Sequence, residues 1–121
     1  YLDAANHSCG TFKAEVDEFI ESGLTKSKCV VVKAPRVQEA SVSYECKLEY
    51  VHPVKNDNGD PTTEIVLARV VRVHVDREVL VENFDPTKPA VDTSKLRTVG
   101  RLGGNIYCGL GQTEDIPRPR V

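Results

Sequence analysis

Residues 101–107 (RLGGNIY), near the C-terminus, bring together side chains that could bind a ligand. Arg101 offers a planar, permanently charged donor fork, and Tyr107 offers a ring and a hydroxyl. Between them, Gly103 and Gly104 allow backbone conformations closed to other residues and a close approach to a neighbouring group. The segment is either one side of a site for a flat, anionic ligand or a glycine turn with an arginine at its edge.

No other motif in the sequence specifies a reaction. A G-x-S-x-G elbow, a P-loop, an H-E-x-x-H motif and a Rossmann G-x-G-x-x-G after a strand are all missing. Carboxylates are plentiful, but no pair stands out for acid–base work. No catalytic residue is predicted, so in an enzyme a bound cofactor would carry the chemistry. A flavin fits, because it needs binding and orientation more than a protein nucleophile.

The cysteines and histidines show no metal-binding pattern. None of the 4 cysteines forms a C-x-x-C pair, and the 3 histidines are far apart without ligand spacing. We therefore predict no metal site and free thiols of a cytoplasmic protein, with Cys46 in the core. The residues concerned are Cys9, Cys29, Cys46, Cys108, His7, His52 and His74.

Length and charge exclude several classes of protein. A chain of 121 residues is expected to form one domain. The net charge of −2, without a basic cluster, gives no nucleic-acid signal. No apolar run approaches the roughly 20 residues of a membrane helix, and no signal peptide is visible. The chain starts with Tyr1 rather than Met, which leaves open whether residues are missing upstream.

The pattern of apolar residues predicts strands with few helices. Residues 1–6 resemble the end of a helix, and a second helix is predicted from Thr11 as N-cap to Gly23. Residues 41–51 alternate as a strand ended by Pro53, with Tyr44 and Cys46 on the core face and Glu45 on the polar face.

A second long strand is predicted over residues 63–75, apolar on both faces in its first half. Arg69 falls in its apolar phase, which indicates a bulge or a buried charge. The turn cluster of residues 56–61 should join the two strands as an antiparallel pair. Shorter elements are a β-branched run (29–32), a loop (84–90), a turn capped by Asp92 and an extended tail (110–121). This pattern is typical of a small β-barrel or an α+β domain.

Taken in order, six motifs resemble the flavin reductase-like, FMN-binding split-barrel family. They occur at residues 6–8, 16–19 with 23–25, 34–39, 44–46 and 101–107. The resemblance implies a mainly β fold with short helices, an antiparallel split β-barrel. It also implies a homodimer with FMN at or near the dimer interface, and flavin reduction by NADH or NADPH.

On this resemblance, Tyr1 aligns with the middle of the family's domain, and the N-terminal part that holds much of the FMN has no counterpart here. We therefore expect a portion of a split barrel, completed by a missing N-terminal segment or chain, with FMN binding weak or absent without it. The expected cofactor-binding residues are Arg101, Gly103, Gly104 and Tyr107, with Glu39 and Asn6 as weaker candidates. The alternative is a truncated, non-catalytic split-barrel module that acts in dimerisation or protein interaction.

Overall fold

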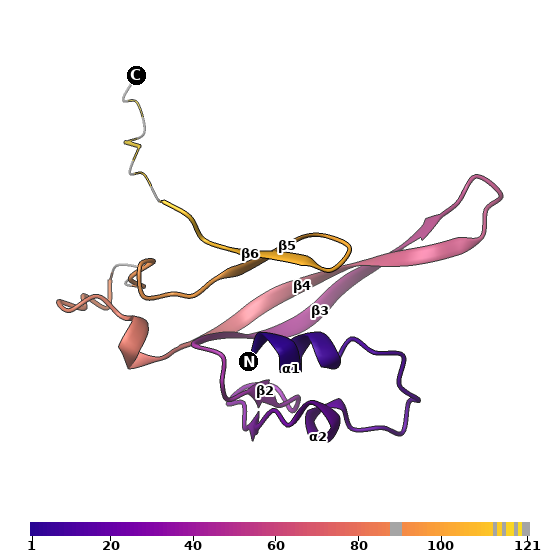
Figure 1. Cartoon of the computed structure of the whole chain (residues 1–121), viewed down its shortest axis with the longest axis horizontal. Helices are drawn as coiled ribbons and strands as arrows, with labels where there is room; N and C mark the ends of the chain where they lie inside the picture. Colours follow the sequence, from indigo (N-terminus) through magenta and orange to yellow (C-terminus); the bar gives the residue numbers. More distant parts are fainter. Residues whose placement is uncertain (88–90, 113, 115, 118, 120–121) are drawn as a thin grey trace. The chain divides into compact units, whose positions relative to one another are not determined.

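The computed structural model describes residues 1–87, 91–112, 114, 116, 117 and 119. The chain divides into two compact units, Tyr1–Asp76 and Arg77–Val121, which are treated separately below. Antiparallel strands dominate, and the helices are short, as the sequence predicts (Figure 1). The elements are α1 (Leu2–His7), α2 (Glu18–Ser22), β1 (Lys26–Ser27), β2 (Arg36–Val37), β3 (Val42–Lys55), β4 (Pro61–Val75), η1 (Arg77–Val79), β5 (Val99–Gly103) and β6 (Ile106–Gly109).

The antiparallel hairpin of β3 and β4 dominates the first unit and confirms the predicted pairing. At its tip, the Asn56 side-chain oxygen accepts hydrogen bonds from the amides of Asn58 (3.0 Å) and Asp60 (2.9 Å). The expected end of the first strand at Pro53 is wrong, because Pro53 pairs with Glu64 and β3 continues to Lys55. A proline is tolerated there since its missing amide can face the open edge of the strand.

Bulges interrupt the ladder on both sides of Arg69. The Lys47–Arg69 pair lies between register shifts at Glu45/Cys46 and at Leu48/Tyr50. The prediction of a bulge near Arg69 is thus confirmed. Its guanidinium is not buried but exposed, where it forms an ion pair with Glu49. Such bulges redirect the side chains of the strand.

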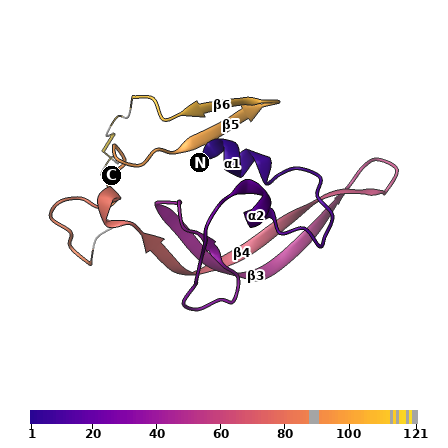
Figure 2. The same ribbon diagram turned by 60° about the horizontal axis from the view of Figure 1, so that its bottom comes forward.

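The second helix is shorter than the sequence predicts. It begins at Glu18, not after Thr11, because the Asp17 side chain accepts a hydrogen bond from the Phe19 amide (3.1 Å) and caps the helix there. Its predicted end at Gly23 is confirmed, with a left-handed φ of 69°. The predicted helix at residues 1–6 is confirmed as α1. Both helices lie on the same side of the β3–β4 hairpin (Figures 1 and 2).

Burial along β3 differs from the prediction at Glu45 and at the residues beside it. Tyr44 is 62% exposed and Cys46 is exposed, whereas Glu45 is only 1% exposed. The expectation of a core position for Cys46 is therefore wrong. The β-branched run 29–32 forms bends and no strand, because its amides turn towards the Glu45 carboxylate. Large apolar side chains of the hairpin are exposed, among them Leu48, Val66 and Leu67.

The second unit contains η1, an isolated bridge between Leu80 and Val91, and the β5–β6 hairpin. The predicted cap is confirmed at Asp92, which accepts hydrogen bonds from the Ser94 amide (3.0 Å) and hydroxyl (2.6 Å). Val79, at 4% exposure, is the one buried apolar residue in the described part of the chain. The predicted loop (84–90) and tail (110–121) extend beyond the described residues. None of the described helices is long and apolar enough to span a membrane.

Candidate functional site

The candidate binding segment forms the β5–β6 hairpin. Gly103 pairs with Ile106, and Gly104 in the turn has a left-handed φ of 54°. Arg101 pairs across the ladder with Tyr107, and its guanidinium carbon lies 5.9 Å from the Tyr107 ring centroid. The same guanidinium donates to the Gly104 carbonyl oxygen at 3.0 Å. The segment is thus a glycine turn in which this hydrogen bond holds the Arg101 side chain in place. The guanidinium has further N–H donors besides the one that bonds to Gly104.

The two glycines of the turn differ in backbone conformation and in their surroundings. Gly104 has the positive φ that favours glycine over residues with a Cβ. Gly103 has no positive φ, and a Cβ built on it would meet no atom within 4 Å. The register shift between Arg101 and Gly103 places this glycine beside a bulge, where glycine is common. The open space at position 103 also leaves room for a ligand to approach the backbone closely.

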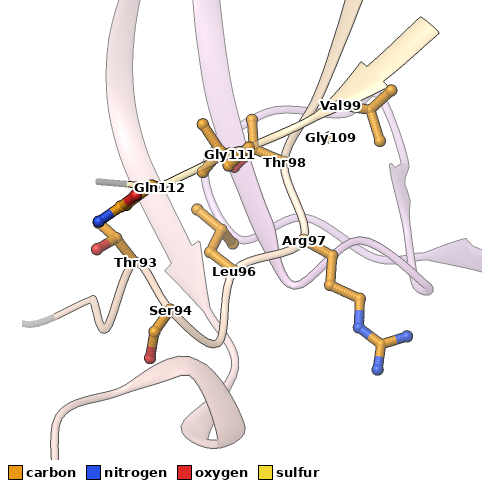
Figure 3. A pocket seen from close by; sticks show the side chains of 10 residues that line it. Thr93, Ser94, Leu96, Arg97, Thr98, Val99, Gly109, Gly111 and Gln112 are labelled. Atoms are coloured by element: carbon orange, nitrogen blue, oxygen red, sulfur yellow. The ribbon is translucent and has the colours of Figure 1, made fainter.

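A cavity of about 570 Å³ lies in the same unit, beside the open end of this hairpin (Figure 3). Its volume is within the range of small-molecule sites. Apolar side chains such as Leu96 and polar ones such as Thr93 line it, and the Arg97 guanidinium points away from Thr98 and Gln112 (Figure 3). Its lining comprises Thr93, Ser94, Leu96, Arg97, Thr98, Val99, Gly109, Leu110, Gly111 and Gln112. The sequence analysis missed these residues, since ordinary loop residues give no motif.

The two weaker candidates lie in the first unit and make local contacts. The Glu39 carboxylate accepts hydrogen bonds from the Thr25 amide at 2.9 and 3.2 Å, and hydrogen bonding to Thr25 lowers the pKa of Glu39. The Asn6 carbonyl oxygen, in α1, accepts from the Cys9 thiol at 2.8 Å. The structure therefore brings together Arg101, Gly103, Gly104 and Tyr107, while Glu39 and Asn6 belong to the other unit.

A second cluster of functional side chains lies in the first unit, around Glu45. The Glu45 carboxylate lies near Cys29 and His74, with one ligand atom of each residue within 4.8 Å of the others. Burial alone would raise the pKa of Glu45, but hydrogen bonds lower it to about 2. They come from the amides of residues 30–32 and from His74. The sequence analysis missed this cluster, because its members are far apart in the chain.

Comparison with known proteins identifies the family. Residues 2–93 match the flavin reductase like domain. The chain belongs to the flavin reductase like family. This membership supports flavin-related oxidoreductase chemistry at the level of the family, and the resemblance noted from the sequence motifs is confirmed.

Two curated relatives span almost the whole chain. Protein BH2278 of Halalkalibacterium halodurans is 32% identical over 120 residues, which cover 99% of this chain and 54% of the relative. Protein YwrF of Bacillus subtilis is 30% identical over 118 residues, which cover 98% of this chain and 56% of the relative. The chain therefore spans about half the length of the curated relatives it matches.

Solved structures support the split-barrel fold. Nitrilotriacetate monooxygenase component B from Bacillus cereus has a TM-score of 0.83 and 26% identity, over 96% of this chain and 55% of its own. A flavin reductase with split barrel domain from Shewanella frigidimarina has a TM-score of 0.76 at 24% identity, covering 97% of this chain and 55% of its own. The latter likeness concerns the fold alone. The predicted fold class, mainly β with short helices in an antiparallel split barrel, is confirmed.

Proposed function

We propose that this protein is an FMN-binding oxidoreductase of the cytoplasm that reduces flavin with NADH or NADPH. The observation that carries this proposal is the match of residues 2–93 to the flavin reductase like domain. Relatedness to nitrilotriacetate monooxygenase component B is consistent with it. A bound flavin would supply the redox chemistry, while the protein supplies binding, orientation and electrostatics.

The β5–β6 hairpin has the chemistry that an anionic flavin requires. Arg101 carries a permanent positive charge and is exposed, so its remaining donors can reach a phosphate or an electron-rich ring. The open space at Gly103 allows a ligand to contact the backbone. The Tyr107 ring, beside Arg101, offers a flat surface on which a planar group can pack.

Titration with FMN tests this proposal. Binding should quench the flavin fluorescence, and the loaded protein should oxidise NADH or NADPH, followed by the loss of nicotinamide absorbance. A protein that neither binds FMN nor oxidises either nucleotide contradicts the proposal. Because the chain spans about half of its relatives, the assay is repeated with any upstream coding sequence restored.

A second function, as a dimerisation or protein-interaction module, is favoured by the exposed apolar surface of the β3–β4 hairpin. Leu48 is 67% exposed, Val66 59% and Leu67 55%, on a hairpin that is apolar over much of its length. Surfaces of this kind usually bind another chain or segment. We propose as its occupant a second copy in a homodimer, or a missing N-terminal segment or chain. A well-behaved monomer in sedimentation, with no partner, counts against this function.

A further inference from the structure

Three metal-ligating side chains from distant parts of the sequence converge at one end of the β3–β4 hairpin. Glu45 is near the start of β3, His74 is near the end of β4, and Cys29 comes from the segment between β1 and β2. One ligand atom from each residue lies within 4.8 Å of the other two. The Nε2 of His74 lies 2.6 Å from Oε1 of Glu45. The ligand atoms of a thiol, an imidazole and a carboxylate thus lie close together.

Backbone amides fix the orientation of the Glu45 carboxylate. The amide of Val30 donates to Oε1 at 2.8 Å, and the amides of Val31 and Val32 donate to Oε2 at 2.6 and 2.9 Å. The Glu45 side chain has no exposed surface, whereas His74 remains 21% exposed. Outer hydrogen bonds of this kind hold metal-binding carboxylates in place. The partial exposure of His74 leaves a route from solvent.

We propose that Cys29, Glu45 and His74 form a binding site for a zinc-type divalent cation. Their sulfur, nitrogen and oxygen donors are the set that Zn²⁺ accepts, whereas Ca²⁺ and Mg²⁺ prefer oxygen alone. Three protein ligands leave the fourth tetrahedral position for water. The site joins β3, β4 and the segment that contains Cys29, so the ion also stabilises their association.

The charges at this site balance. Binding releases the thiol proton of Cys29, and the proton that Nε2 of His74 donates to Glu45 moves to Nδ1, so that Nε2 presents its lone pair to the ion. The thiolate and the carboxylate then carry two negative charges against the two positive charges of the cation. The ion takes the place of the hydrogen bond between His74 and Glu45. The hydrogen bonds that the backbone amides donate to the Glu45 carboxylate remain.

Cobalt substitution tests the proposal directly. Co²⁺ added anaerobically to the purified, metal-free protein should bind once per chain and give a thiolate-to-cobalt charge-transfer band, which Zn²⁺ then abolishes. The Cys29→Ser variant should lose the band. The His74→Asn variant should bind Co²⁺ more than about tenfold more weakly. Zn²⁺ should raise the melting temperature of the wild type but not of Cys29→Ser.

The matched control is Cys46→Ser, which removes an exposed thiol next to Glu45 in sequence. It should keep the band, the stoichiometry and the response to Zn²⁺. A wild-type protein without the band, or a Cys29→Ser variant that retains it, overturns the proposal. Loss of the band in the Cys46→Ser variant to the same extent as in Cys29→Ser also overturns it. These readouts need no flavin, so they are independent of the proposed oxidoreductase activity.

Discussion

His74 and Glu45 meet across the β3–β4 hairpin, with Nε2 of His74 2.6 Å from Oε1 of Glu45. The histidine gives a buried carboxylate a fourth donor, besides the amides of residues 30–32. A buried carboxylate without such partners would be strongly destabilising. The Glu45 carboxylate therefore ties the segment between β1 and β2 to the hairpin through hydrogen bonds.

The first prediction concerns the Glu45→Gln variant. It keeps the size of the side chain but replaces one carboxylate oxygen with an NH2 group, which donates hydrogen bonds and cannot accept them. The backbone amides that donate to that oxygen therefore lose their acceptor. We expect the melting temperature to fall by at least about 5 °C. Glu49→Gln is the control, because Glu49 pairs with Arg69 on the surface, and its loss should change the melting temperature little. Equal changes in both variants would contradict the structural role of Glu45.

The second prediction concerns acid stability. In the folded protein the pKa of Glu45 is about 2, compared with 4.5 ordinarily, so the ionised form is favoured by folding. This contribution to the free energy of unfolding is fully present above pH 4.5 and decreases as the pH falls towards 2. The urea concentration at the midpoint of unfolding should therefore fall as the pH is lowered from 6 to 2.5. A chelator is added to keep the proposed metal site empty.

The Glu45→Gln variant isolates the contribution of Glu45, because other acidic groups shift in the same direction. Its urea midpoint should depend less on pH than that of the wild type, and the two proteins should converge at low pH. Parallel pH profiles would contradict the assignment. The other groups with lowered pKa values are Asp17, Glu39, Asp85 and Asp92.

The sequence predicts elements well where the signal is local. The Asn56 turn and the helix end at Gly23 depend on short-range hydrogen bonds and on backbone conformation, and both are confirmed. The predicted start of α2 was wrong because a second capping residue, Asp17, lies within the segment whose apolar residues have helical spacing. Alternation also failed at Glu45, because its burial comes from hydrogen bonds to the amides of residues 30–32 and to His74, which are distant in the chain.

The candidate site divides in the same way. The hairpin of residues 101–107 is a contiguous motif, so its glycines and Arg101 could be singled out from sequence. The Cys29–Glu45–His74 cluster requires the hairpin register and the path of residues 28–37, which depend on long-range contacts. No spacing rule of metal sites covers such separations.

The third prediction separates ligand approach from folding at the two glycines. Gly103→Ala should leave the free energy of unfolding within about 0.5 kcal/mol of wild type, because the added Cβ meets no atom within 4 Å. If flavin contacts this backbone, the same variant should bind FMN at least about tenfold more weakly. Gly104→Ala should instead destabilise the protein by about 1 kcal/mol, owing to its φ of 54°. FMN affinity unchanged in a folded Gly103→Ala variant would argue against contact at this position.

The fourth prediction tests the charge at Arg101. Arg101→Gln should weaken FMN binding by about tenfold or more, because hydrogen bonds to a charged group contribute roughly 1.5–3 kcal/mol. Arg101→Lys should recover part of the affinity, since it keeps the charge but not the planar fork. The control is Arg77→Gln, an exposed arginine in η1 that should bind FMN as the wild type does. Equal affinities in all variants would exclude Arg101 from the flavin site.

The fifth prediction tests the apolar surface of the β3–β4 hairpin. Leu48 is 67% exposed, and a lysine there would place a charge in any contact that covers the surface. Leu48→Lys should therefore shift sedimentation of the protein towards the monomer without reducing its helix and strand content. Thr63→Lys, an exposed polar position near the hairpin tip, is the matched control and should sediment as the wild type does. If Leu48→Lys sediments like wild type, this part of the hairpin does not form the interface, because a buried, unpaired lysine would weaken association.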